Sequence, residues 1–201
     1  GNHEVNGKGT LILTKAVEVQ RNPGKSLEEL ESIYRKYLGA ENIIWIDEGL
    51  LEDRLSFEGP LPIGNKDSAY TVLTTGGHID EFIRFVNDST VMLAWPFEDT
   101  VGYIHRENAL RMEAAYQILQ QSRLEDGRPI RIVKTPMPPL IVKKMYPGDY
   151  VYDELRQLNY ENGHVFPDGK EIKVIAAASY LNFVISNQVV LVPVYGHDDS
   201  P

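Results

Sequence analysis

Two strand–helix–strand units place the strongest constraint on how this chain can fold. The first covers residues 10–46 and the second covers residues 90–134, with no strict sequence repeat between them. In the second unit, "STVMLAWP" and "RPIRIVKTPMPP" are strands on either side of a helix expected from about His105 to Ser122. Alternating strands and helices predict a mixed α/β fold. Repetition of the unit suggests a propeller-like arrangement, in which loops gather on one face around a central site.

The first unit contains the clearest helix of the chain. Ser26 is expected at its N-cap, Glu29 completes a capping box three residues later, and Gly39 ends it. An apolar stripe at helical spacing follows the cap: Leu30, Ile33, Tyr34, Tyr37 and Leu38. The helix of the second unit presents a similar face: Met112, Ala115, Tyr116 and Leu119.

Other segments are less regular. "NGKG" before the first strand reads as a hairpin turn of the I′ type. Glu48 to Asp67 shows no sustained period, and a loop of that length is either functional or mobile. Tyr146 to Lys170 reads as an insertion with a short hairpin around "FPDGKEI". The chain closes as two strands around a turn at residues 186–188.

Composition excludes several classes of protein. The 201 residues are 42% hydrophobic and 24% charged, which is ordinary for one globular domain with a sizeable core. A net charge of −9 argues against a nucleic-acid partner and is compatible with a cationic substrate. No run of eighteen apolar residues and no signal-like N-terminus is present, so we expect no membrane partner and take the cytoplasm as the default location. The chain has no cysteine, which excludes a disulfide framework, a zinc ribbon or a thiol nucleophile within it.

"TTGGHIDEFIRFV" is the segment richest in candidate chemistry. If it is extended, His78 and Asp80 point to the same side, and an imidazole and a carboxylate face one pocket. Gly76 and Gly77 would let backbone or substrate approach closely. The alternative is that His78 and Asp80 cap a helix beginning near Glu81. A metal site is disfavoured, because no second cluster of ligands at suitable spacing accompanies the pair.

"ASYLNFVISN" holds a second candidate. Tyr180 and Asn182 alternate with apolar residues on an expected strand, and a buried amide needs hydrogen-bond partners. Asn182 would therefore bond backbone groups or orient a substrate. The remaining histidines outside the first few residues (His105, His164 and His197) lie in polar surroundings and are expected at the surface. Trp45 and Trp95 end apolar strands and are expected in the core.

Seven short words in a fixed order resemble one known family. They are "NGKGTLILT", "QRNPG", "YLGAENIIWI", "GGHIDEFIRFV", "VMLAW", "VKTPMP" and "ASYLNFVISNQVVLVPVYG". In this order they resemble the agmatine deiminase and Porphyromonas-type peptidyl-arginine deiminase family, across nearly the whole chain.

The resemblance implies a pentein fold, an α/β propeller of repeated ββαβ units, and hydrolysis of a guanidinium group to a urea with release of ammonia. It places the protein in polyamine metabolism if agmatine is converted to N-carbamoylputrescine. On this mapping His78 is the general acid/base, Asp80 is a guanidinium clamp, and Asn182 and Gly77 contribute to substrate binding. Arg84 would hold the following helix in place. No metal or organic cofactor is implied, and a homo-oligomer is left open.

Two words of the family are missing from the chain. Its nucleophilic cysteine lies in a "GGGNxHC" word beyond "VPVYG", and a second guanidinium-binding aspartate lies in an "RDxGP" word before Gly1. We therefore expect residues 1–201 to be part of a single deiminase domain in a longer protein and to be inactive alone. A natural truncation that serves as a binding module is the alternative. Probable insertions near 48–74 and 146–170 leave agmatine and peptidyl-arginine both open as substrates.

Overall fold

The computed structural model describes residues 1–64, 66–96 and 102–195. The strands are β1 (Glu4–Val5), β2 (Thr10–Thr14), β3 (Asn42–Ile46), β4 (Leu61–Pro62), β5 (Ser68–Val72), β6 (Ile83–Phe85), β7 (Thr90–Trp95), β8 (Arg131–Pro136), β9 (Val142–Met145), β10 (Ile172–Ala176), β11 (Val184–Ser186) and β12 (Val189–Leu191). The α-helices are α1 (Lys15–Arg21), α2 (Leu27–Leu38), α3 (Tyr103–Gln121) and α4 (Tyr150–Arg156). Short 3₁₀ turns are η1 (Leu51–Asp53), η2 (Ser56–Glu58), η3 (Ile79–Glu81) and η4 (Glu161–Gly163).

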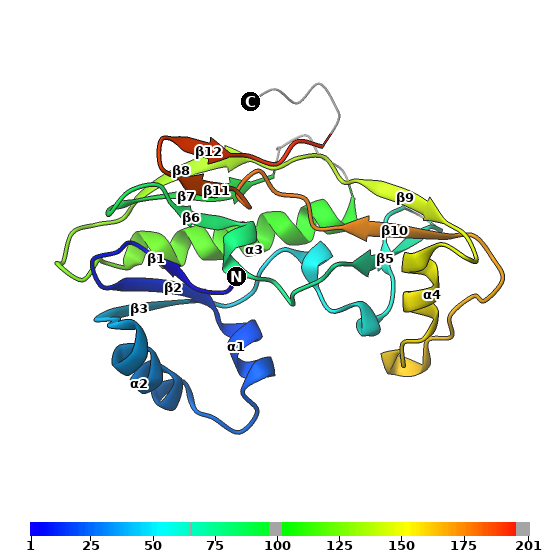
Figure 1. Ribbon diagram of the computed structural model, residues 1–201, viewed down its shortest axis with the longest axis horizontal. Coiled ribbons are helices and arrows are strands. Elements are labelled where there is room, and N and C mark those ends of the chain that lie inside the picture. Colours follow the sequence, from blue (N-terminus) through cyan, green and yellow to red (C-terminus); the bar gives the residue numbers. More distant parts are fainter. Residues whose placement is uncertain (65, 97–101, 196–201) are drawn as a thin grey trace.

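The two expected units share one topology (Figure 1). In the first, β1 is antiparallel to β2 and β2 is parallel to β3, with α1 and α2 in the crossover. In the second, β6 is antiparallel to β7 and β7 is parallel to β8, with α3 in the crossover. Parallel neighbours need a long crossover, which the helices supply. The α/β class is confirmed. Closure into a propeller stays a prediction, because no sheet within the described ranges closes on itself.

The helix predictions hold where local signals were strong. Ser26 and Glu29 form the reciprocal capping box, and Gly39 adopts the left-handed conformation at the C-cap. Only part of the apolar stripe on α2 is buried: Leu30 and Tyr34 are buried, whereas Tyr37 is 71% exposed.

Three local predictions need correction. The β1–β2 hairpin is present, but its turn is not type I′, because Lys8 has no positive φ. The side-chain oxygen of Asn6 instead accepts three backbone N–H groups of the loop. Residues 166–172 form a turn and not a hairpin, since β10 pairs with β5 and β9. The first closing strand ends at Ala176, and residues 177–183 are irregular.

The turn between the last two strands was predicted from the sequence, whereas helix α4 was not. The predicted turn before β12 is confirmed as a hairpin between β11 and β12, with Gln188 at a φ of 68°. Helix α4 lies inside the tract 146–170, which the sequence indicated only as an insertion.

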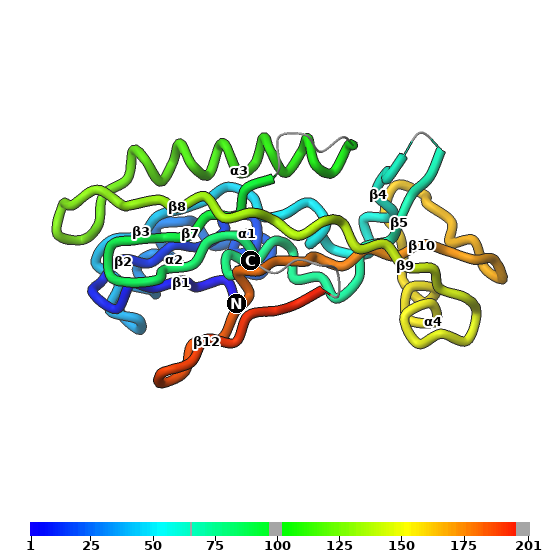
Figure 2. The backbone as a smooth tube through the Cα atoms, turned by 90° about the horizontal axis from the view of Figure 1, so that it is seen from above, coloured from blue at the N-terminus to red at the C-terminus, as the bar shows by residue number. Residues whose placement is uncertain are grey.

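The two irregular tracts meet in a separate lobe that is visible beside α4 in Figure 2. Strand order β4–β5–β10–β9 joins them in one sheet. An aromatic cluster backs that sheet: Tyr70, Tyr152, Tyr160 and Phe166. The hydroxyl of Tyr70 lies 2.7 Å from Nε2 of His164.

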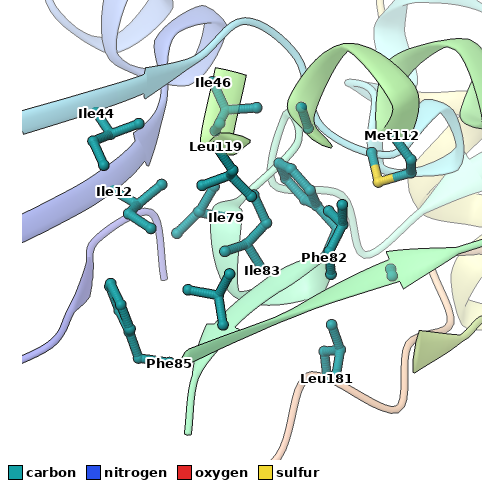
Figure 3. Close-up of a cluster of buried hydrophobic side chains, with 14 of the residues drawn as sticks. Ile12, Ile44, Ile46, Ile79, Phe82, Ile83, Phe85, Met112, Leu119 and Leu181 are labelled. Atoms are coloured by element: carbon teal, nitrogen blue, oxygen red, sulfur yellow. The ribbon is translucent and has the colours of Figure 1, made fainter. Parts of the chain in front are cut away.

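The largest apolar cluster lies where the two ββαβ units meet (Figure 3). Ile12 and Ile46 come from the first unit, and Met112 comes from α3 of the second. Ile79, the middle residue of the His-x-Asp segment, and Phe82, which follows two residues after Asp80, are fully buried in this cluster. The core therefore anchors the segment that carries the candidate chemistry. Within the described ranges, no helix has both the length and the apolar character that a membrane crossing requires.

Candidate functional site

The His-x-Asp segment is a tight turn and not an extended strand. His78 precedes the 3₁₀ turn η3, Asp80 lies inside it, and β6 follows at Ile83. Neither side chain caps a helix, because no side-chain cap hydrogen bond is made at η3 and no α-helix begins near Glu81. The capping alternative is therefore wrong. The turn nevertheless brings the two side chains together.

His78 and Asp80 form a partly buried pair. Nδ1 of His78 lies 3.9 Å from Oδ1 of Asp80, and the two side chains are only 15% and 18% exposed. Nε2 of His78 is buried and has no hydrogen-bond partner in the described part of the chain. Burial lowers the pKa of His78, the nearby charge of Arg21 lowers it further, and Asp80 and Asp53 oppose these effects. The imidazole is thus neutral near pH 7, with one nitrogen available to accept a proton.

The carboxylate of Asp53 fixes the backbone of the His-x-Asp turn, a role that was not predicted from the sequence. This carboxylate is 1% exposed and lies at the end of η1. Its oxygens accept hydrogen bonds from the backbone N–H groups of Thr75 at 2.7 Å, Gly77 at 2.9 Å and His78 at 3.1 Å. The Thr75 hydroxyl also donates to it. A buried carboxylate with four donors holds the backbone of the His-x-Asp turn in one conformation.

Gly77 permits a close approach of backbone to backbone. A Cβ on Gly49 would lie 2.5 Å from the α-carbon of Gly77, and a Cβ on Gly77 would lie 3.1 Å from the α-carbon of Gly49. Gly77 also has a φ of 99°. Its N–H is used by Asp53, so the close approach foreseen for this glycine is made by the chain itself.

Asn182 also lies near the His-x-Asp turn, but not in the position that the sequence predicts. Its side chain is exposed and lies in the irregular segment 177–183, not buried on a strand as predicted. Its Nδ2 donates to Oε1 of Glu81, the residue after Asp80. Burial raises the pKa of Glu81 to about 7. His78, Asp80 and Asn182 are thus brought to one region through Glu81.

Arg84 is structural, but it does not hold a helix. It lies on β6, where Nε is 3.0 Å from Oε2 of Glu4 on β1. Nη1 donates to the backbone carbonyls of Leu181 at 3.0 Å and Phe183 at 2.8 Å, and the guanidinium lies 4.4 Å from the centre of the Phe183 ring. Arg84 therefore fastens the segment that carries Asn182 to the sheet of the second unit.

The first ββαβ unit is also hydrogen-bonded to the His-x-Asp turn, through Asn2. Asn2 is buried, and its Oδ1 accepts the N–H groups of Thr14 at 3.1 Å and Ile79 at 3.2 Å. Its Nδ2 donates to the buried Glu18 of α1 at 2.8 Å. Strand β2, helix α1 and turn η3 are therefore joined through one amide.

The remaining histidines and tryptophans differ partly from expectation. Burial lowers the pKa of His105, and His164 is half-buried against Tyr70, so neither is a simple surface residue. His197 lies outside the described residues. Trp45 and Trp95 pack against the core as predicted. Among the described residues, no three His, Cys, Asp or Glu side chains gather where they could share a metal ion.

The chain is similar in sequence and in fold to known deiminases. The sequence profile of the family described as Porphyromonas-type peptidyl-arginine deiminase matches residues 1–58 and 66–200. The agmatine deiminase of Stutzerimonas stutzeri is 30% identical over 98% of this chain, and that of Pseudomonas aeruginosa is 30% identical over 96%. This chain covers 44% of the length of each. The structure of the Enterococcus faecalis agmatine deiminase superposes with a TM-score of 0.65 at 24% identity, over 98% of this chain and 44% of that one. That last likeness concerns the fold alone.

Proposed function

Because the chain belongs to the Porphyromonas-type peptidyl-arginine deiminase family, we propose that it supplies part of the active site of a guanidine deiminase. The reaction is hydrolysis of a guanidinium group to a urea, with water consumed and ammonia released. Since the chain spans 44% of the length of the curated relatives, the activity is proposed for the whole protein.

The His78–Asp80 pair is the observation that carries the proposal. A guanidinium is planar and permanently charged, and one carboxylate can accept two of its N–H groups in parallel. Asp80 takes that role. His78 is neutral near pH 7 and carries an unpartnered buried nitrogen, so it can take a proton and later return it.

The nucleophile must come from outside these residues, because the chain has no cysteine. The cysteine thiol gives its proton to His78, the resulting thiolate attacks the guanidinium carbon, and the C–N bond breaks as His78 passes that proton to the departing ammonia. Water then loses a proton to His78 and displaces the thiolate, which releases the urea product. A strong nucleophile is needed, since the guanidinium carbon is a poor electrophile.

Agmatine is the favoured substrate, and the relatives named agmatine deiminase support it. The second candidate is peptidyl-arginine, which the family description favours. A small amine needs a closed pocket and a peptide needs an open groove. An inactive pentein fragment that acts as a binding module is the candidate from a different class.

The fold of the whole protein is proposed on the same basis. Residues 1–201 form part of a single deiminase domain, and the two ββαβ units of this chain belong to a pentein propeller. The segments near 48–74 and 146–170 are insertions that form the lobe around β5 and α4. Residues 59–65, within the first of them, lie outside the match to the family profile.

Ammonia release by the full-length protein tests the function. We expect turnover of agmatine, with His78→Ala and Asp80→Ala each lowering kcat/KM by about a hundredfold or more. His105→Ala, which changes a half-buried histidine at the start of α3, is the matched control and should keep activity. Circular dichroism must show that each variant is folded. A folded His78→Ala variant with the wild-type rate would rule out the assignment, and activity on an arginine-containing peptide but not on agmatine would select the second substrate.

A further inference from the structure

Glu81 is a carboxyl group at the site that the proposed mechanism does not use. It follows Asp80 directly in η3 and is half-buried. Its Oε1 accepts the hydrogen bond from Nδ2 of Asn182. This contact joins two turns that are 101 residues apart in the sequence.

The backbone around Asn182 is already fixed without Glu81. Leu181 and Phe183 are buried on either side, and their carbonyls both accept from Arg84. The Asn182 side chain itself is exposed, so it would otherwise sample several rotamers. The hydrogen bond to Glu81 is the contact that orients this amide toward η3.

We infer that Glu81 is a positioning residue of the site, which holds the Asn182 amide beside Asp80 and, when ionised, favours binding of a cationic substrate. The inference rests on the proposed function, because it assumes that the His78–Asp80 pair receives a guanidinium. It extends that function by assigning a role to a residue that does not itself react.

The surroundings of Glu81 make this contribution dependent on pH. Burial raises the pKa of Glu81 to about 7, and the charges of Asp53 and Asp80 also raise it, while the hydrogen bond from Asn182 lowers it. Tyr195, the other titratable group that faces it, has a raised pKa and stays neutral.

The sign of the pH effect follows from these groups. Below pH 7 Glu81 is protonated and neutral, and above pH 7 it is a carboxylate. The KM for a cation should therefore fall as pH rises from 6 to 8. Burial lowers the pKa of His78, so the imidazole titrates at lower pH than Glu81 and affects kcat there.

The test measures kcat and KM of the full-length protein for agmatine between pH 6 and pH 8.5. For the wild type we expect KM to fall by about threefold to tenfold across this range, as one nearby charge would produce. Glu81→Gln should give a KM that does not vary with pH and a kcat within about twofold of wild type, because its amide oxygen still accepts from Asn182. Glu81→Ala loses both the contact and the charge and should raise KM at every pH. Glu113→Gln removes an exposed carboxylate on α3 and should keep the wild-type profile.

Two results would overturn the inference while leaving the proposed function intact. One is a Glu81→Gln enzyme that keeps the wild-type change of KM with pH. The other is a Glu81→Ala enzyme with wild-type KM throughout.

A readout without turnover separates the two proposals. The side-chain amide NMR signal of Asn182, assigned by its loss in Asn182→Ala, should shift with a midpoint near pH 7 in the wild type and should not titrate in Glu81→Gln. This shift in a protein that releases no ammonia would support the contact and reject the deiminase function. An amide signal that does not titrate in the wild type would reject the role of Glu81.

Discussion

At the scale of single residues, the site depends on buried groups that do not face a substrate. Asp53 shows this most clearly, because its two oxygens accept three backbone N–H groups and one hydroxyl around His78. A neutral amide at this position would direct its own N–H₂ group at one of these donors. The conformation of the His-x-Asp turn would then lose its main support.

Asp53→Asn should therefore cost about 2–4 kcal/mol of unfolding free energy, because a buried acceptor of charge-assisted bonds is lost. In a variant that still folds, kcat for ammonia release should also fall, because the loss of this carboxylate displaces His78. Urea denaturation and the ammonia assay measure the two effects. Asp47→Asn is the control and should change neither, because its carboxylate is 68% exposed and lies 4.0 Å from its nearest basic nitrogen, on Lys15. Wild-type stability in Asp53→Asn would show that the turn holds its shape without this carboxylate.

Gly49 offers a second test at this scale. A methyl group there would meet the backbone of Gly77 at 2.5 Å, and backbone cannot move aside cheaply. Gly49→Ala should cost about 1–3 kcal/mol through overpacking and should lower activity by shifting the turn. Gly64→Ala provides the comparison, because a Cβ there meets only a side-chain carbon at 3.8 Å. Equal melting temperatures for the two variants would contradict the steric account.

At the scale of elements, helix α3 is tied to η1 through one buried amide. Oδ1 of Asn108 accepts the Leu51 N–H at 2.9 Å, and its Nδ2 donates to Glu52 at 2.7 Å. Glu52 is buried, and burial raises its pKa. Because η1 ends at Asp53, these contacts couple the position of α3 to that of the His-x-Asp turn.

Asn108→Ala should destabilise the fold by about 2–4 kcal/mol, since it leaves a buried N–H and a buried carboxyl unpaired. Leu110→Ala on the exposed face of the same helix should change stability by less than about 0.5 kcal/mol. Thermal and urea unfolding of the two variants compare the effects directly. Similar losses for both would mean that helix propensity, and not the buried amide, determines the result.

The same contacts explain which parts of the structure the sequence predicts. Both caps of helix α2 are predicted at the correct residues, because the Ser26–Glu29 capping box and the left-handed Gly39 are each local signals. Turn η3 and segment 177–183 were not, because Asp53 and Arg84 reach them from distant parts of the chain. His78 and Asp80 were singled out by spacing and resemblance. A carboxylate followed by a glycine-rich segment offered no comparable local signal for Asp53.

At the scale of the whole molecule, the hairpin β11–β12 stands apart from the two ββαβ units (Figure 2). Its strands are apolar, yet they are exposed: Val184, Ile185, Val189, Val190 and Leu191. Ile185 and Val190 are paired across the hairpin. No other strand in the described part of the chain pairs with this hairpin. An exposed apolar strand pair of this kind is a typical site of association between chains.

Residues 1–201 expressed on their own should therefore self-associate through this hairpin and melt with poor cooperativity. Replacing Ile185 and Val190 together by lysine adds two charges to the exposed strands and should return the polypeptide toward its monomer mass of 22.7 kDa. Leu110→Lys together with Val165→Lys adds the same two charges at exposed apolar residues outside the hairpin and should leave association unchanged, which separates an effect of the hairpin from one of net charge. Sedimentation velocity measures the masses, and a thermal scan measures cooperativity. A wild-type polypeptide that sediments as a monomer with a sharp, high-temperature transition would show that the exposed hairpin does not drive association.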